Sequence, residues 1–126
     1  MKKIVFRCLV ITALYACGGG GSKADKKPGD NSVDITRNPD YQKGLNLVAL
    51  NKCMTCHQID DKLTGPPYRE VANKYAGMPD TIITYLAKKV ISGGKGVWGE
   101  IFMTAHPTIS QFDAEAMVKY ILLLKK

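Results

Sequence analysis

The sequence is organised around Cys53-Met54-Thr55-Cys56-His57, which places two thiols and one imidazole within a single pentapeptide. Thiols at this spacing reach the two vinyl groups at one edge of a haem and form thioethers, and the adjacent imidazole binds the iron. The pentapeptide therefore predicts one covalently bound haem c, attached through Cys53 and Cys56, with His57 as a ligand of its iron.

Three other kinds of site use paired cysteines, and the rest of the chain fits each of them less well. A disulfide between Cys53 and Cys56 would close too short a loop to restrain the unfolded chain much. A thioredoxin-type redox pair belongs to a βαβ unit, whereas this sequence shows no strand pattern. A zinc site would need a further protein ligand beside His57, and only His106 is available to supply it. Haem attachment is the favoured interpretation.

The residues from Pro39 onward show helical periodicity, so the domain 39–126 is predicted to be all-α. The first helix is expected to begin at Pro39 behind an Asn38 cap and to run toward Cys53. Three further helices are expected, from Pro66-Pro67 to Gly77, from Asp80 to Ser92, and from Ser110 to the end of the chain. The expected fold is about four helices packed around the haem. A core of this size is only marginally stable by itself, and the haem would supply much of its apolar filling.

The first 16 residues, 1–16, are expected to be an export signal. Its basic side chains are Lys2, Lys3 and Arg7. The apolar run that follows is far shorter than the roughly 20 residues of a membrane-spanning helix. The run ends in Leu14-Tyr15-Ala16-Cys17, which resembles the processing box of bacterial lipoproteins, so Cys17 is predicted to carry lipid. An ordinary cleaved signal with an incidental cysteine is the alternative.

The segment 17–38 is expected to be a flexible linker behind this lipid anchor. It is rich in Gly, Lys, Asp and Pro, and it lacks the apolar surface that would offset the entropy of ordering it. The protein is thus predicted to be exported and held by lipid to a bacterial membrane, facing the periplasm or the cell exterior.

The charge balance excludes nucleic acid as a partner. The whole chain has 18 basic and 11 acidic side chains, a formal net charge of +7. The signal removes three basic and no acidic side chains, which leaves 15 against 11, a net +4. This weak excess comes without a basic run interleaved with aromatic residues. It permits docking to an acidic protein.

Several motifs together resemble the small bacterial class I cytochromes c. They are Asn51 to His57, Asp60, Gly65-Pro66-Pro67-Tyr68, Val71-Ala72, Lys74 to Gly77, Gly94-Lys95-Gly96-Val97-Trp98-Gly99 and Met103. The resemblance covers the chain from Pro39 onward. It implies a cytochrome c fold, transfer of electrons between larger redox proteins by a monomeric haem domain, and Met103 as the distal iron ligand.

Other methionines compete with Met103 for the iron. Met54 lies inside the haem pentapeptide, and Met117 has the spacing of a core residue in the last helix. Met78 follows the end of a predicted helix and stays a lesser candidate. The segment 93–109 is long for a loop in a compact domain, and its length is explained if it carries Met103 to the face opposite His57.

The resemblance also implies supporting roles for other residues. The carbonyl of Pro66 would accept the imidazole proton of His57, and Gly44 and Tyr120 would mark a close crossing of the first and last helices. Trp98 would either donate its indole proton to a haem propionate or act as a hydrophobic plug. The family usually has proline beside its ligand methionine, whereas here Phe102 precedes it and a second histidine, His106, follows it.

The sequence therefore predicts a non-enzymatic one-electron carrier with a His/Met-ligated haem iron. Its partners would be redox protein donors and acceptors docking at the haem edge. Iron closed on both faces has no position for a substrate, which favours a carrier over a catalyst. The alternatives are a haem-based sensor or catalytic haem domain with an open sixth position, and a fixed subunit of an oxidoreductase.

Overall fold

The computed structural model describes residues 34–126. The predicted export signal, Cys17 and most of the predicted linker lie outside this range. Structure begins before the expected boundary at Pro39, because Ile35–Arg37 form a short 3-10 helix, η1. The Asp34 side chain caps it by accepting a hydrogen bond from the Thr36 amide at 3.1 Å. The last residues assigned to the linker thus already belong to the folded part.

The four helices expected from the sequence are present in residues 34–126. They are α1 (Pro39–Leu50), α2 (Tyr68–Lys74), α3 (Thr81–Ser92) and α4 (Gln111–Leu123). Two predicted helix starts have the expected caps: Asn38 Oδ1 accepts from the Asp40 amide at 2.8 Å, and Ser110 Oγ accepts from the Asp113 amide at 3.1 Å. Helix α2 is shorter than predicted at both ends.

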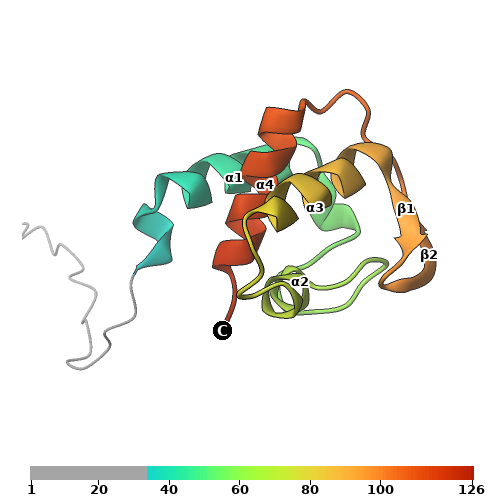
Figure 1. Cartoon of the computed structure of the whole chain (residues 1–126), viewed down its shortest axis with the longest axis horizontal. Coiled ribbons are helices and arrows are strands. Elements are labelled where there is room, and N and C mark those ends of the chain that lie inside the picture. Colours follow the sequence, from blue (N-terminus) through green and yellow to red (C-terminus); the bar gives the residue numbers. More distant parts are fainter. Residues whose placement is uncertain (1–33) are drawn as a thin grey trace, which may run out of the picture. The chain divides into compact units, whose positions relative to one another are not determined.

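Helix α4 is the centre of the fold and packs against α1, α3 and α2 (Figure 1). Its side chains Ala114, Met117, Val118 and Tyr120 are among the most buried in residues 34–126. Where α1 crosses α4, a Cβ on Gly44 would overlap the Tyr120 Cβ and the Ala116 carbonyl oxygen. The absence of a side chain at Gly44 therefore permits the close crossing of the two helices.

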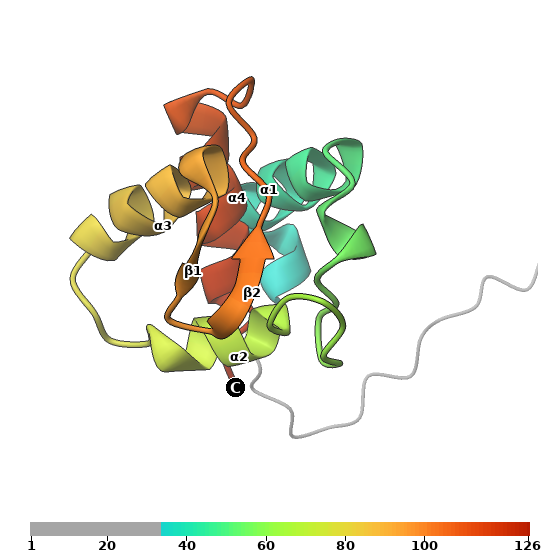
Figure 2. The ribbon, with the colours of Figure 1, turned by 90° about the vertical axis from the view of Figure 1, so that its right-hand side faces the viewer.

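The segment after α3 is not the strandless loop expected from the sequence. It forms a short antiparallel hairpin of β1 (Gly94–Gly96) and β2 (Gly99–Met103), in which Gly94 pairs with Met103 and Gly96 with Gly99. Figure 2 shows this hairpin across one end of the domain, in front of α4. Its glycines have positive φ angles and no side chains, so the segment lacked the apolar alternation that identifies a strand.

Within residues 34–126, no helix combines the length and the apolar character needed to cross a membrane.

Candidate haem site

The thiols and the imidazole of the pentapeptide are presented by a tight turn after α1. Lys52 takes a left-handed conformation with φ 55°, and Cys53–Thr55 then form a 3-10 helix, η2. The amides of Cys56 and His57 both donate to the Cys53 carbonyl, at 3.2 and 3.1 Å. Both thiols are free, and Cys53, Cys56 and His57 all line one cavity. The turn thus gathers the three groups on one side of the chain.

The ring of His57 is held by the segment that follows it. Its Nδ1 lies 2.8 Å from the Pro66 carbonyl oxygen. Because a carbonyl oxygen only accepts, Nδ1 carries the proton and Nε2 keeps its lone pair for a metal. The loop is closed by the Gly65 amide, which donates to the Cys56 carbonyl at 2.8 Å. This arrangement suits an axial ligand, since the bond to Pro66 sets both the tautomer and the ring direction.

Two more residues confine the His57 ring from its sides. A Cβ on Gly65 would lie 2.7 Å from Nδ1 and 2.8 Å from Nε2 of His57, so only glycine leaves room for the ring. Tyr68 stacks on the ring with centroids 5.2 Å apart and planes at 11°. These contacts of Gly65 and Tyr68 were not predicted from the sequence. The position of Gly65 directly before Pro66 could have indicated its contact with His57. The sequence indicated Tyr68 only as an apolar residue of a helix.

The Tyr68 hydroxyl faces the Cys53 thiol. Burial raises the pKa of Cys53 above its usual range, and the hydrogen bond from Tyr68 opposes this rise only in part. Burial likewise raises the pKa of Tyr68, so its hydroxyl stays neutral and can donate. Tyr68 therefore links two parts of the haem pentapeptide, with its ring against His57 and its hydroxyl at Cys53.

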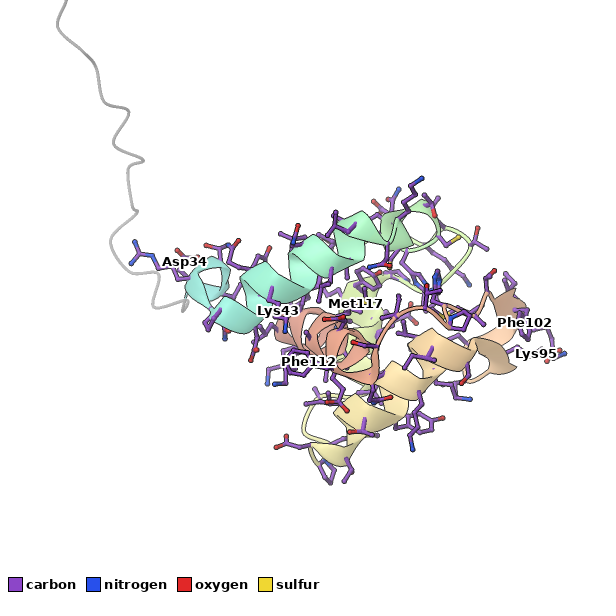
Figure 3. All side chains as sticks on the ribbon, turned by 90° about the horizontal axis from the view of Figure 1, so that it is seen from above. Asp34, Lys43, Lys95, Phe102, Phe112 and Met117 are labelled. Carbon is purple, nitrogen blue, oxygen red and sulfur yellow. The ribbon has the colours of Figure 1, made fainter. Side chains whose placement is uncertain are left out.

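The cavity has a volume of about 560 Å³, within the range of small-molecule and cofactor sites. All the site residues expected from the sequence line it: Cys53, Cys56, His57, Pro66, Trp98 and Met103. The far wall comes from the hairpin and α3, and Met117, Val118 and Ile121 of α4 contribute apolar side chains. Figure 3 places Met117 in the interior of the domain and Phe102 at the hairpin end.

The remaining methionines are placed less well to meet His57 across this cavity. Met78 is 49% exposed and lines a separate, smaller depression beside α2 and α3. Met54 is 37% exposed and is not among the cavity residues. Met117 borders the cavity but is 1% exposed and belongs to the packed core of α4. His106 also borders it, and its amide donates to the Ile91 carbonyl at 3.0 Å.

Trp98 lies in the turn between β1 and β2 and is half-buried. The Lys74 ammonium lies 5.3 Å from the centroid of its ring, a cation–π contact between the hairpin and α2. The indole therefore helps to hold the hairpin turn against α2 while it lines the cavity.

The rim of the cavity is basic. Four exposed lysines border it, namely Lys52, Lys62, Lys89 and Lys95, and Glu70 is the one acidic lining side chain, while Lys95 forms an ion pair with the exposed Glu100. In residues 34–126 there is no group of three or more His, Cys, Asp or Glu side chains that could hold a metal ion. Paired thiols, an imidazole with a free Nε2 and an apolar cavity fit a haem.

Comparison with known proteins agrees with this fit. Residues 41–125 match the cytochrome c family. Cytochrome c-552 of Nitrosomonas europaea is 42% identical over 84 residues, which cover 67% of this chain and 81% of that protein. Cytochrome c-551 of Azotobacter vinelandii is 39% identical over 84 residues and is covered completely, with 67% of this chain aligned.

The fold agrees as well. The crystal structure of wild-type Nitrosomonas europaea cytochrome c552 superposes with a TM-score of 0.60 at 42% identity, covering 64% of this chain and 99% of that one. The chain therefore belongs to the cytochrome c family as a small class I monohaem cytochrome c, with covalently bound haem c and its iron, and acts in electron transfer.

Proposed function

We propose that this cytochrome is a one-electron carrier whose haem is attached through Cys53 and Cys56 and ligated by His57 and Met103. When bound, the haem iron alternates between its ferric and ferrous states and so carries one electron. The observation that carries the proposal is that His57 and Met103 come from distant segments and line the same cavity. His57 follows η2, and Met103 ends β2.

The two side chains have complementary properties as ligands. The bond between Nδ1 of His57 and the Pro66 carbonyl leaves the lone pair of Nε2 free for the iron. The thioether of Met103 is a soft donor, which favours ferrous iron and raises the reduction potential. With both His57 and Met103 as ligands, the iron would have no position left for a substrate or a gas. This ligand set favours a carrier over an enzyme.

The basic rim fits a docking partner with an acidic surface. Lys52, Lys62 and Lys89 border the cavity, and the exposed Phe102 adds an apolar side chain at the hairpin end (Figure 3). Electrostatic attraction of this kind raises the rate of encounter and weakens with salt. We infer that monomers meet redox protein donors and acceptors at this rim, where the haem edge would lie.

Export and lipid attachment at Cys17 belong to the same proposal. Their support is the sequence alone: a basic start, a short apolar run and a cysteine after a small residue. Replacing Cys17 by serine is expected to release a cytochrome with an unchanged absorption spectrum from the membrane. A variant that stays in the membrane would contradict anchoring by lipid.

The ligand set is tested by spectra of Met103→Ala beside His106→Ala and Met78→Ala. Ferric wild-type protein should show the weak long-wavelength charge-transfer band from sulfur to iron. Only Met103→Ala should lose that band and gain binding of cyanide. Loss of the band in Met78→Ala, or loss of native ligation in His106→Ala with Met103→Ala unchanged, would show that the distal ligand is misassigned.

A further inference from the structure

We propose that Gly93 is a positioning residue for Met103. The inference rests on the proposed ligation by Met103 and deepens it, because it names what determines where the ligand segment lies. Gly93 follows α3, and its backbone packs directly against the segment from Met103 to Ala105. The structure thus fixes the ligand segment by a backbone contact that no side chain at residue 93 would allow.

The contact is tight and involves atoms that cannot rotate away. A Cβ on Gly93 would overlap the Met103 carbonyl oxygen, and it would lie 2.8 Å from the Ala105 nitrogen and 3.0 Å from the Thr104 carbonyl carbon. All three are backbone atoms. A side chain at position 93 would therefore displace the Met103–Ala105 backbone as a unit instead of turning a neighbouring side chain aside.

The other side of this contact is firmly anchored. Gly93 is buried, and its amide donates to the Lys89 carbonyl at 2.8 Å in the last turn of α3. Its φ of 66° and ψ of −153° lie in a region that is essentially restricted to glycine. Residue 93 is thus part of the rigid end of α3, so the strain of an added side chain falls on the ligand segment.

A second anchor holds the ligand segment on the same helix end. The His106 amide donates to the Ile91 carbonyl at 3.0 Å, and Gly94 pairs with Met103 in the hairpin. The segment 103–106 is therefore attached beside the end of α3 at both of its ends. A shift of this backbone changes the reach of the Met103 sulfur into the cavity, which the flexible methionine side chain compensates only in part.

Gly77 supplies a matched control outside the haem cavity. Its φ of 76° is close to the 66° of Gly93, so alanine is strained at both positions. A Cβ at Gly77 meets nothing within 4 Å, and Gly77 does not line the cavity. Comparing Gly93→Ala with Gly77→Ala therefore separates displacement of the ligand segment from backbone strain alone.

The experiment measures the sulfur-to-iron charge-transfer band and the rate of cyanide binding in the ferric haem protein. Gly93→Ala should weaken the band and speed cyanide binding by about tenfold or more, since overpacking opposes ligation. Gly77→Ala should keep the wild-type band and rate. Equal behaviour of the two variants would overturn the positioning role of Gly93.

A parallel pair of variants tests the second anchor. His106→Pro removes the amide that bonds Ile91, whereas His106→Ala keeps it, so only the proline should weaken the band. This pair decides the question if Gly93→Ala yields no haem protein, and equal bands in the two variants would then overturn the inference. Met103→Ala distinguishes failure of the proposed ligation from failure of the Gly93 inference, because a band retained in this variant contradicts Met103 as the ligand.

Discussion

The two walls of the haem cavity hold the two proposed iron ligands in different ways. In the proximal wall, residues 51–68, His57 is held by neighbours in sequence: Pro66 bonds its Nδ1, Gly65 borders its ring and Tyr68 stacks on it. In the distal wall, residues 93–106, Met103 is held by attachment of its backbone to the end of α3.

The two walls are expected to respond to different kinds of substitution. The proximal wall is a local structure built around one ring, so it responds to changes in the side chains that touch this ring. The distal wall is a long connection whose ligand position depends on where helix α3 ends and on the hairpin register. Changes at the proximal wall are therefore expected to affect retention of the haem and stability, and changes at the distal wall to affect ligation and potential.

The largest effect is expected from the thiols of the proximal wall. Replacing both Cys53 and Cys56 by alanine should abolish covalent attachment, and Cys53→Ala alone should leave one thioether. Extraction of the denatured protein with acid and organic solvent measures this, because thioethers do not dissociate. Thr55→Ala, inside the same pentapeptide, keeps both thiols and should keep its colour. Colour that leaves the wild-type protein with the solvent would contradict covalent attachment.

The next effect concerns the space beside His57. Gly65→Ala would place a Cβ 2.8 Å from the Nε2 of His57 and push the ring from its position. The expected loss of stability is about 1–3 kcal/mol, as for other overpacked sites, together with a changed reduction potential. Chemical unfolding and a potentiometric titration measure both.

Gly77→Ala is the control for Gly65→Ala. Residue 77 has a φ of 76°, and a Cβ there meets nothing within 4 Å. This variant should lose stability only through backbone strain and should leave the reduction potential unchanged. An unaltered potential in Gly65→Ala would show that the proximal ring tolerates the change.

A smaller effect is expected at the Tyr68 hydroxyl. Tyr68→Phe keeps the stack on His57 but removes the hydroxyl at Cys53, and because a thioether sulfur is a weak acceptor the expected loss in unfolding free energy is below about 1 kcal/mol. Tyr120→Phe is the contrasting variant, because the Tyr120 hydroxyl is buried and has no hydrogen-bond partner within residues 34–126. It should be neutral or stabilising. Equal losses in the two variants would argue against a role for the Tyr68 hydroxyl.

The smallest effect is expected from an ion pair at the edge of the proximal wall. The hydrogen bond from Arg69 lowers the pKa of Asp60, and the charges of Arg69 and Lys126 act in the same direction. A lowered folded-state pKa stabilises the fold above the usual Asp pKa of about 3.9, and this contribution is lost as pH falls through the folded-state value.

Asp60→Asn should therefore be less stable than the wild type near neutral pH, and the difference should vanish in strong acid. Unfolding measured across this pH range tests the prediction, with Asp61→Asn as the control that removes the neighbouring carboxylate. A difference that grows as pH falls would have the wrong sign for this ion pair.

The proximal wall was the more predictable of the two. Its chemistry lies in consecutive residues, and the carbonyl of Pro66 stands nine residues after His57, where a short loop brings it back. The helix caps at Asn38 and Ser110 were predictable for the same reason, because each side chain bonds an amide two or three residues further along the chain. The stack of Tyr68 on His57 was missed, because a tyrosine on the apolar face of a helix does not reveal which ring it meets.

The distal wall shows where reasoning from the sequence ends. The hairpin was expected to be a loop, since its glycines conceal the strand pattern. The contact of Gly93 with the Met103 carbonyl joins residues ten positions apart through backbone atoms alone, so no residue type signals it. Met103 stays a prediction as the ligand, and it rests on the place of Met103 after the Gly96-Val97-Trp98-Gly99 segment.

Addition of carbon monoxide to the ferrous wild-type protein tests the His57/Met103 carrier most directly. A methionine sulfur bound opposite His57 leaves no open position, so the visible spectrum should stay unchanged on the time scale of mixing. Met103→Ala, treated in the same way, should bind carbon monoxide at once. Rapid binding by the wild-type protein would contradict the proposal and favour a sensor or catalytic haem domain.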